Sequence, residues 1–586
     1  MSDSPSSATA ALILPKDLAA ETGRVNVQID GIWRQFAKGT RMIEACRQAG
    51  TIVPHYCYHP KLSSPGSCRM CMVQMGLPAR PAPGQEPQRD AAGYETISWV
   101  ARPVIACANT VSENMGIRTH GDLVAQTREG VMEFLLINHP LDCPICDQAG
   151  ECRLQEHSVG YGRSSSRFME MKVKKPKNVE IGPRVRLDDE RCILCGRCIR
   201  FMSEVVGEPV LGFTQRGTHT TLTAHPDRPL DSNYSLNTTD ICPVGALTSN
   251  DFRFQMRVWF LKETPSIDVN CGTGTNIQLW TRGNKIYRIT PRQNNEVNSC
   301  WMPDSHRLNF HSLDSVARFT EPLAKHGALH EPVSWEAAFL TAASKLKAQA
   351  PEKIAIIASA RMTNEELFLT RALATALGTT NLSLVPRFSE PDALLVAADR
   401  NPNTTGAMLV LDTQDPFSKL DAIRAGVRSG AIKALIVLGE DLITDAGFCF
   451  EDLAPLEFLL QSHTLANPTA LAAHLVLPTA AFAEKRGSMV NLSGRLQRLN
   501  RAIEPPGQCR DDWEILRDLT QAITGNTGHL DSIEEVFQAL AETLPAFSGL
   551  TLSKIGHLGI PVMDTGYQIP LLTTERARQA ARLITG

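Results

Sequence analysis

The sequence predicts a multidomain protein of mixed α+β and α/β class, and three observations indicate this. The chain has 586 residues, whereas single domains rarely exceed ~250 residues. Twelve of its 16 cysteines lie before residue 250, which separates a cysteine-rich first half from the rest. Beyond about residue 315, short apolar runs alternate with helical stretches, a pattern typical of a largely parallel sheet.

Composition limits the classes of function that remain. Hydrophobic residues make up 43% and charged residues 21% of the chain, as in ordinary globular proteins. The formal net charge of -3 gives no reason to expect a nucleic-acid partner. No apolar run approaches the ~18–20 residues that span a bilayer, and the N-terminus resembles neither a secretory signal nor a transit peptide. We therefore expect a soluble, cytosolic, bacterial protein.

The first predicted elements are a strand, a turn, a second strand and a helix. Residues 25–29 alternate apolar and polar side chains and lead into Asp30-Gly31, which predicts a strand and a type I′ hairpin turn. A strand at 32–36 is followed by Thr40, the predicted N-cap of a helix that carries Cys46 on its apolar face. We expect Cys46 to pack in the core. This order resembles the start of a β-grasp ferredoxin.

Four cysteines follow that suit a small metal centre: Cys57, Cys68, Cys71 and Cys107. Cysteines in a reducing compartment bind metal more often than they form disulfides. The Cys68/Cys71 pair suits one iron of a [2Fe–2S] cluster, and Cys57 with Cys107 suits the other. The spacing departs from the plant-type pattern, because ten residues separate the first two cysteines. Tetrahedral zinc is the alternative, since four thiolates also suit that ion.

A histidine completes the second group, which consists of His139, Cys143, Cys146 and Cys152. A short apolar helix is predicted over 131–138, ended by the proline that follows His139. Three cysteines are one ligand too few for a [4Fe–4S] cluster. Because His139 lies at the end of that helix, we expect it to be the fourth ligand rather than a structural histidine.

The third group has the two-residue gaps that place three thiolates on the corners of a [4Fe–4S] cluster. Its members are Cys192, Cys195 and Cys198, and the distant Cys242 is expected to close the same cluster. Zinc is disfavoured here, because three evenly spaced cysteines do not make the paired pattern of zinc sites.

Three motifs in this order resemble one family. They are Asn138–Cys146 (NHPLDCPIC), Asp189–Cys195 (DERCILC) and Thr239–Leu247 (TDICPVGAL). They are similar to the large iron–sulfur subunit (the G-type subunit) of bacterial respiratory complex I, the proton-translocating NADH:quinone oxidoreductase. The resemblance implies a [2Fe–2S] cluster on the first group and a [4Fe–4S] cluster on each of the other two.

The same resemblance implies a place in a larger assembly. Single electrons would pass from a subunit that binds FMN and oxidises NADH to the Cys57 group. They would then reach the Cys192 group and the His139 group, and continue through another iron–sulfur subunit towards quinone. The chain would lie in the peripheral arm, on the cytoplasmic side of the inner membrane, with membrane contact only through the complex. It would bind no nucleotide and perform no substrate chemistry itself.

A fourth cluster is not expected. Some bacterial members of the family carry a further cubane bound by a Cys-x2-Cys-x3-Cys run and a distant cysteine. The corresponding residues here are Asp268, Cys271, Thr275 and Cys300. Carboxylate and hydroxyl oxygens are poor ligands for iron–sulfide corners, so we predict packing roles for Cys271 and Cys300.

The C-terminal half is predicted to be an α/β domain. The apolar runs at 353–359, 407–411 and 434–438 are predicted strands, and 364–377 is a predicted amphipathic helix. The segment 477–497 resembles the molybdopterin oxidoreductase fold.

A molybdenum enzyme would need a catalytic cysteine or selenocysteine and a longer cofactor-enclosing domain than the roughly 270 residues that remain. We therefore expect a shortened domain without molybdopterin, in which Cys449 and Cys509 are ordinary buried thiols.

Five domains follow from these patterns. They are a β-grasp [2Fe–2S] ferredoxin domain (22–117), a His/Cys [4Fe–4S] domain (118–157), a [4Fe–4S] ferredoxin-like domain (158–256), a degenerate domain without a cluster (257–313) and a shortened molybdopterin-oxidoreductase-like domain (314–586). The basic run 172–177 is interpreted as a solvated linker or a subunit contact.

Two other classes of function remain open. The first is the electron-relay subunit of a soluble NAD-linked hydrogenase or formate dehydrogenase, which shares the N-terminal ferredoxin modules. A hydrogenase relay would end near residue 250, and a formate dehydrogenase would contain a complete molybdenum site. The second is a zinc-stabilised scaffold, which would be colourless.

Overall fold

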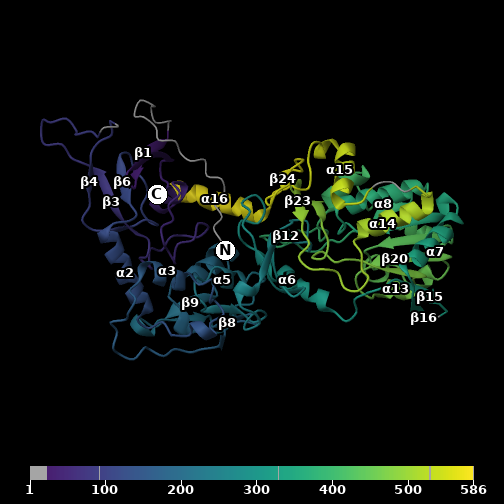
Figure 1. Cartoon of the computed structure of the whole chain (residues 1–586), viewed down its shortest axis with the longest axis horizontal. Coiled ribbons are helices and arrows are strands. Elements are labelled where there is room, and N and C mark those ends of the chain that lie inside the picture. Colours follow the sequence, from purple (N-terminus) through teal and green to yellow (C-terminus); the bar gives the residue numbers. More distant parts are fainter. Residues whose placement is uncertain (1–22, 91–92, 328, 527–529, 585–586) are drawn as a thin grey trace. The chain divides into compact units, whose positions relative to one another are not determined.

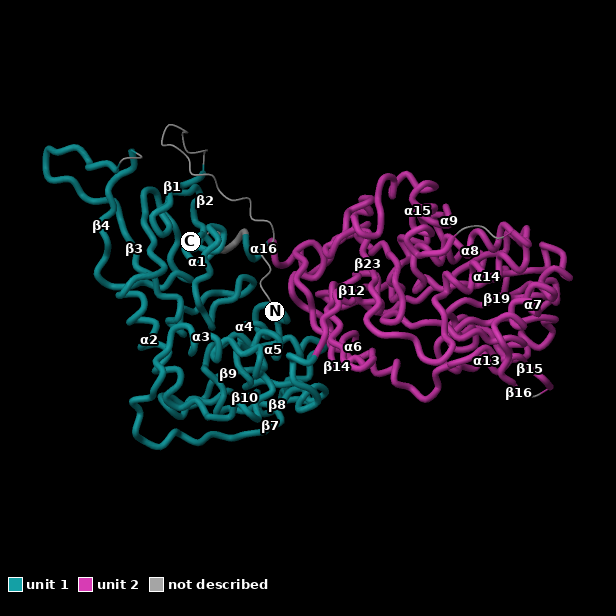
Figure 2. The backbone as a smooth tube through the Cα atoms, viewed as in Figure 1, with its two compact units in different colours: residues 1–260, 577–586 teal, residues 261–576 magenta. Residues whose placement is uncertain are grey.

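The computed structural model describes residues 23–90, 93–327, 329–526 and 530–584. The chain forms two compact units, residues 1–260 with 577–586 and residues 261–576 (Figure 2). In the part of the chain described here, no helix is long and apolar enough to cross a bilayer. The N-terminal residues 1–22, where we expect no targeting signal, lie outside the described residues. The division into five domains remains a prediction.

The first unit begins with a mixed sheet in the order β2-β1-β6-β3-β4, with β5 paired to β3 (Figure 1). Its strands are β1 (Arg24–Ile29), β2 (Ile32–Ala37), β3 (Met72–Pro78), β4 (Ile97–Trp99), β5 (Val104–Ile105) and β6 (Met115–Arg118). Asp30 and Gly31 both have positive φ, at 50° and 88°, as a type I′ turn requires. Antiparallel β1 and β2 and the parallel β1–β6 pair then form a β-grasp sheet.

Helix α1 (Met42–Gln48) packs on this sheet. Cys46 is fully buried in its core, so the prediction for this residue is confirmed. The predicted N-cap is wrong, because the helix begins after Arg41. The Thr40 hydroxyl instead donates a hydrogen bond to the Ala37 carbonyl at 2.7 Å, so it closes the preceding turn.

The rest of the first unit consists of short elements separated by the cysteine-bearing loops. They are α2 (Asp122–Leu136), α3 (Arg153–Tyr161), α4 (Arg197–Phe201) and α5 (Asn237–Asp240), with strands β7 (Val179–Glu180), β8 (Val185–Leu187), β9 (Leu211–Thr214), β10 (Thr221–Ala224) and β11 (Leu247–Ser249). Strands β11, β8 and β7 form one sheet, and β9 pairs with β10. Helix α2 begins well before the predicted 131–138 helix and ends two residues earlier.

The second unit contains a seven-stranded sheet in the order β16-β15-β21-β20-β19-β17-β18. Its strands are β15 (Leu323–His326), β16 (Leu329–Pro332), β17 (Ile354–Ala358), β18 (Leu382–Leu384), β19 (Ala434–Leu438), β20 (Phe458–His463) and β21 (Leu475–Pro478). The strands from β18 to β21 run parallel, and β15 joins β21 antiparallel. The predicted strands at 353–359 and 434–438 are confirmed.

Helices cover both faces of this sheet (Figure 1). Ile354 and Ile356 of β17 pack against one layer, while Ala355 and Ile357 pack against the other, as the two-residue period of a strand requires. The first layer contains α7 (Trp335–Lys347), α8 (Asn364–Ala376), α9 (Thr404–Leu411), α14 (Asp512–Thr524) and α15 (Ile533–Thr543), and the second contains α10 (Leu420–Arg428), α12 (Phe450–Leu453) and α13 (Pro468–Ala472). A short α11 (Leu442–Asp445) follows β19.

The predicted strand at 407–411 is wrong, because these residues belong to helix α9. A short apolar run cannot be assigned to strand or helix from its periodicity alone. Ala407 and Val410 are buried at helical spacing, and a Cβ on Gly406 would lie 2.1 Å from Asn364 Oδ1 of α8. Close packing against α8 therefore favours the helix.

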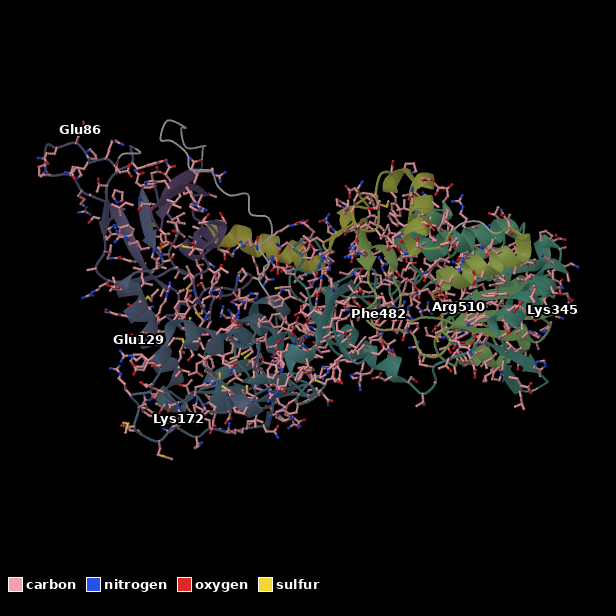
Figure 3. All side chains as sticks on the ribbon, viewed as in Figure 1. Glu86, Glu129, Lys172, Lys345, Phe482 and Arg510 are labelled. Carbon is pink, nitrogen blue, oxygen red and sulfur yellow. The ribbon has the colours of Figure 1, made fainter. Side chains whose placement is uncertain are left out.

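Two small sheets complete the second unit. One contains β12 (Lys262–Ile267), β13 (Asn276–Arg282) and β14 (Lys285–Pro291), and the other contains β22 (Gly487–Val490), β23 (Arg495–Leu499) and β24 (Ile560–Pro561). Helix α6 (Asp304–Arg307) follows β14. Phe482, labelled in Figure 3, packs against the core of the sheet that contains β12, β13 and β14. Helix α16 (Pro570–Ile584) ends the described chain.

Candidate functional site

The four cysteines of the first group meet in the interior of the first unit. Cys57, Cys68, Cys71 and Cys107 are all buried. Hydrogen bonds from the thiols of Cys107 and Cys68 hold the pKa of Cys57 well below its usual range, and Cys107 also lowers the pKa of Cys71. The pKa of Cys68 and of Cys107 is raised mainly by the same bonds to Cys57. Four buried sulfurs in mutual contact suit a metal centre with thiolate ligands.

The second group surrounds a pocket. Arg191 and Gly245 form part of its wall. All four expected ligands also line it: His139, Cys143, Cys146 and Cys152. Cys143 is exposed, Cys152 is half-buried and Cys146 is buried. A Cβ on Gly245 would lie only 2.4 Å from Cys146 Sγ, so only glycine leaves this wall open.

His139 has the properties of a neutral ligand. Burial, reinforced by the positive charges of Lys172 and Arg191, lowers the pKa of His139 to about 4. Its Nδ1 atom is buried and has no hydrogen-bond partner among the described residues. A buried nitrogen without a partner is costly, and coordination of a metal would remove that cost.

The third group is formed by two loops. Leu194 and Gly196 both adopt positive φ, at 55° and 66°, which turns the chain between Cys192 and Cys198. The Leu194 N–H donates to Cys192 Sγ at 3.4 Å. Burial raises the pKa of all four thiols. The negative charges of neighbouring thiolates of the group raise the pKa of Cys192, Cys198 and Cys242 further, whereas Arg197 and Arg200 act in the opposite direction on Cys195.

Backbone amides point at the sulfur of Cys242, which the second loop supplies. Burial raises the pKa of Cys242 to about 11, while hydrogen bonds from the N–H groups of Val244, Ala246 and Leu247 act in the opposite direction. Amide hydrogen bonds to sulfur are typical of iron–sulfur ligands, whose potential they tune. They suit a thiolate and not a buried, protonated thiol.

Two arginines that the sequence analysis missed connect the groups. Arg200 Nη2 donates to the carbonyl of Cys57 at 2.6 Å and to that of Cys195 at 3.3 Å. Arg197 is buried and donates to the carbonyls of Tyr58 and Ile241. The loops of the first and third groups therefore lie side by side. A pair of arginines within a cysteine motif is the signal that could have revealed them.

The ligand loops also share one apolar core. Tyr56 is completely buried there, with Met132, Leu154, Val244 and Ala246. Cysteines from all three groups pack in or against this core: Cys57, Cys68, Cys152, Cys192, Cys195 and Cys242. The structure thus brings together all twelve sequence-predicted ligands, as three neighbouring sets of four.

The basic run 172–177 is tied to these sets by hydrogen bonds and ion pairs. Lys172, labelled in Figure 3, donates through Nζ to the carbonyls of Leu136 and Ile137, at 2.9 and 2.8 Å, at the C-terminus of α2. Lys177 pairs with Asp142 at 2.6 Å, inside the second group's loop. Lys172 and Lys177 are therefore in contact with the segment around His139, which the interpretation of this run as a solvated linker did not predict.

The expected positions for a fourth cluster do not assemble four thiolates. Asp268, Cys271 and Thr275 lie on one loop and are buried, and Cys300 is half-buried. Within the described part of the chain, the side chain that joins Asp268 and Cys271 is His306, which the sequence analysis did not single out. The buried Cys271 thiol donates to the Leu395 carbonyl at 3.6 Å.

Cys449 and Cys509 have different environments. Cys509 is buried and its thiol donates to the Phe319 carbonyl at 3.0 Å, as expected of a packing residue. Cys449 is exposed, so its predicted burial is wrong. Its place as the N-cap of α12 puts it at the surface of the second unit.

Family models match most of the chain in the predicted order. The matches are a 2Fe-2S iron-sulfur cluster binding domain (22–121), an NADH-ubiquinone oxidoreductase-G iron-sulfur binding region (128–167), the ferredoxin-like domain of NADH-quinone oxidoreductase subunit 3 (182–248), an NDSU1/NuoG-like 4Fe-4S domain (261–311) and molybdopterin oxidoreductase (318–403 and 396–522). The predicted fold class is thereby confirmed.

Named relatives cover nearly the whole chain. The NADH-quinone oxidoreductase G subunit of Rickettsia conorii is 30% identical over 90% of this chain and 91% of its own. The corresponding protein of Rickettsia prowazekii is 35% identical over 84% and 70%. The mitochondrial NADH-ubiquinone oxidoreductase 78 kDa subunit of Neurospora crassa is 30% identical over 90% and 84%. An NAD+-reducing [NiFe]-hydrogenase structure matches 40% of this chain and 91% of its own, with 26% identity and a TM-score of 0.33.

Proposed function

This chain belongs to the family of the NADH-quinone oxidoreductase G subunit, and we propose from that premise that it is an electron-transfer subunit of complex I. It relays single electrons from the subunit that oxidises NADH towards quinone. Bound iron–sulfur clusters supply the one-electron redox chemistry. The chain's own residues hold those clusters, set their surroundings and keep them close to one another.

We assign one [2Fe–2S] and two [4Fe–4S] clusters to the three groups. Cys57, Cys68, Cys71 and Cys107 hold the first; His139, Cys143, Cys146 and Cys152 hold the second; and Cys192, Cys195, Cys198 and Cys242 hold the third. The buried His139 Nδ1 without a hydrogen-bond partner and the glycine wall at Gly245 support the second assignment. The amide hydrogen bonds to Cys242 support the third.

The order of transfer that we propose runs from the Cys57 group to the Cys192 group and then to the His139 group. Arg200 joins the carbonyls of Cys57 and Cys195, which supports the first step. Gly245, three residues after Cys242, lies against Cys146, which supports the second. The observation that carries the proposed function is this single buried core, which residues from all three groups share.

Partners follow from the ends of that path. We propose that the FMN-binding subunit docks at the Cys57 group and that an iron–sulfur subunit receives electrons beyond the His139 group. The complex then lies on the cytoplasmic side of the bacterial inner membrane, and this chain reaches the membrane only through it. We propose that residues 318–522 keep the molybdopterin oxidoreductase fold without the cofactor and that the chain binds no nucleotide.

A relay in a hydrogenase or formate dehydrogenase is the less supported alternative. A hydrogenase relay would end near residue 250, whereas the complex I relatives align over about 90% of this chain. Molybdenum analysis separates a formate dehydrogenase, because that enzyme would contain the metal and this chain is expected to contain none.

The relay is tested in the intact complex with Cys195→Ser. Loss of the cluster bound by the third group should abolish the oxidation of NADH that is coupled to quinone reduction. NADH oxidation by an artificial acceptor that takes electrons directly from the flavin should remain, because that step precedes this chain. Unchanged quinone reduction, with the cluster shown by EPR to be missing, would contradict the proposal.

A further inference from the structure

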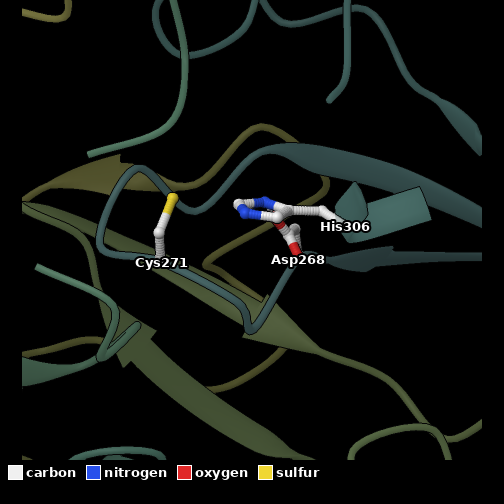
Figure 4. A group of neighbouring side chains, drawn as sticks. All are labelled: Asp268, Cys271 and His306. Carbon is white, nitrogen blue, oxygen red and sulfur yellow. Dashed lines mark hydrogen bonds and ion pairs between the residues drawn. The ribbon is translucent and has the colours of Figure 1, made fainter. Parts of the chain in front are cut away.

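Three buried side chains in the second unit converge outside the three ligand groups. They are Asp268 and Cys271, on the loop between β12 and β13, and His306, on helix α6 (Figure 4). One ligand atom from each lies within 4.8 Å of the other two. His306 Nδ1 and Asp268 Oδ2 are 2.6 Å apart, and all three residues are buried.

This donor set does not fit a [4Fe–4S] cluster, even though the family model at 261–311 is described as a 4Fe-4S domain. Such a cluster is held by four thiolates, with a histidine in place of one at most in the groups described above. Here a single thiolate meets one imidazole and one carboxylate. The residues instead match the ligand types of one mononuclear transition-metal ion.

We propose that Asp268, Cys271 and His306 bind a single Zn2+ ion in place of a cluster. Zinc accepts thiolate, imidazole and carboxylate ligands together and has no strong geometric preference. Magnesium and calcium bind oxygen ligands, so the thiolate and imidazole disfavour them. The two positive charges of the ion are balanced by one thiolate and one carboxylate, which suits a buried site.

The Asp268 carboxylate is oriented for this role. Its Oδ1 accepts hydrogen bonds from the backbone N–H of Asn270 at 3.1 Å and from the Asn270 side chain at 2.6 Å. The other oxygen, Oδ2, is thereby held towards His306. Carboxylate ligands of metals are commonly fixed by hydrogen bonds of this kind. When zinc binds, Oδ2 and Nδ1 coordinate the ion in place of their direct contact with each other.

The Cys271 thiol can lose its proton without leaving a partner unsatisfied. Burial and the Asp268 carboxylate raise its pKa to about 11, so metal binding displaces a proton from this sulfur. The Leu395 carbonyl that accepts from Cys271 also accepts from the Thr273 hydroxyl at 2.7 Å. That carbonyl therefore stays satisfied when Cys271 becomes a thiolate.

Thr275 supplies a second, independent observation. Its hydroxyl is completely buried and has no hydrogen-bond partner among the residues described, which is costly for a hydroxyl group. Its backbone carbonyl accepts from the Asp268 N–H at 2.8 Å, so the two residues close the same loop. A zinc site with three protein ligands keeps a water molecule in the fourth position, and the unsatisfied hydroxyl on the same loop is a group that such a water would satisfy.

The test begins with zinc and iron analysis of the full-length chain, purified anaerobically and washed with chelator. We expect about one zinc and about 10 iron atoms per chain, and X-ray absorption at the zinc edge should show one sulfur at ~2.3 Å with nitrogen or oxygen donors at ~2.0–2.2 Å. A zinc-free chain, about 14 irons, or a zinc with four sulfurs would each overturn the proposal.

Variants then locate the ion. Cys271→Ser and His306→Ala should each lose the zinc while keeping all the iron. Cys509→Ser is the matched control, because Cys509 is another buried thiol that donates to a backbone carbonyl in the same unit, and it should keep both metals. If a ligand variant fails to fold, the absorption spectrum of the unaltered chain still decides. Zinc retained in folded Cys271→Ser would place the ion elsewhere.

Discussion

At the scale of single residues, the hydrogen bonds that His139 lacks support its role as a ligand. His139 Nδ1 is buried without a hydrogen-bond partner among the described residues, and burial keeps the ring neutral by lowering its pKa to about 4. Protonation therefore does not compete with metal binding at neutral pH. Most buried polar atoms of structural side chains have a hydrogen-bond partner; His157 Nε2 is also buried without one, so it is the place of His139 in the wall of the second group's pocket that favours ligation.

Replacing His139 tests this directly. His139→Ala should remove one [4Fe–4S] EPR signal and about four irons per chain. His139→Cys should keep the cluster with a lower midpoint potential, because histidine ligands raise cluster potentials relative to cysteine. Redox titration followed by EPR measures both results. A full iron count in His139→Ala would show that this side chain is no ligand.

Gly245 is the second residue-scale test. Gly245→Ala would place a Cβ about 2.4 Å from Cys146 Sγ and 3.1 Å from Gln148 Cβ, so Cys146 must shift. The EPR signal of the His139 group should be lost or broadened, while the other two remain. Gly212→Ala is the control, because a Cβ there meets nothing within 4 Å. Identical spectra for both variants would refute this role of Gly245.

At the scale of elements, loops carry most of the expected ligands, with Cys198 at the start of helix α4, and arginines hold those loops. Arg200 donates to the carbonyls of Cys57 and Cys195, and helix α4, which carries it, is only five residues long. Arg200→Ala should lower stability by about 2 kcal/mol, since charged hydrogen bonds are lost. It should also alter the EPR line shapes of both neighbouring groups. Thermal unfolding and EPR measure these effects.

The exposed Arg216 provides the control for Arg200. Arg216→Ala should leave both the melting temperature and the spectra unchanged. A change confined to one group in Arg200→Ala would mean that this side chain does not couple the two loops.

A buried glutamate on helix α8 makes the stability of the folded chain depend on pH. Burial raises the pKa of Glu365 to about 7, whereas the unfolded value lies near 4.5. Between these values the folded state keeps a proton that the unfolded state releases, so stability falls as pH rises, by up to ~1.4 kcal/mol per pH unit. Glu365→Gln should abolish this contribution.

The comparison is the melting temperature of Glu365→Gln against the unaltered chain at pH 5 and pH 8. The variant should gain relative stability at the higher pH. Asp511, whose pKa burial also raises to about 7, adds a similar slope that this variant leaves in place. A difference that does not depend on pH would contradict the raised pKa of Glu365.

Sequence reasoning succeeded at this scale where the signal is local. The Asp30-Gly31 turn and strands such as β17 depend on neighbouring residues, whereas the ligand sets drawn from cysteine spacing remain a prediction. The strand predicted at 407–411 failed because burial against α8, a tertiary contact, decides its conformation. For the same reason His306 was missed, since 35 positions separate it from Cys271 and only the fold brings the two together.

At the scale of the whole molecule, the two units carry different tasks. The first holds all twelve expected ligands, and the second has the fold of a molybdopterin oxidoreductase domain. The ligand groups of the first unit could be predicted from sequence because most members of each group lie a few residues apart, although Cys107 and Cys242 lie far along the chain from the rest of theirs. Their spatial order could not, because it depends on Arg200 and Gly245, whose contacts exist only in the folded chain.

A metal count decides whether this electron-relaying chain binds one [2Fe–2S] and two [4Fe–4S] clusters. The chain is purified anaerobically, and iron, acid-labile sulfide and molybdenum are measured, with EPR of the reduced sample. We predict about 10 irons and about 10 sulfides per chain, with no molybdenum. About 14 irons, a count near zero, or stoichiometric molybdenum would contradict the assignment of three clusters to this chain.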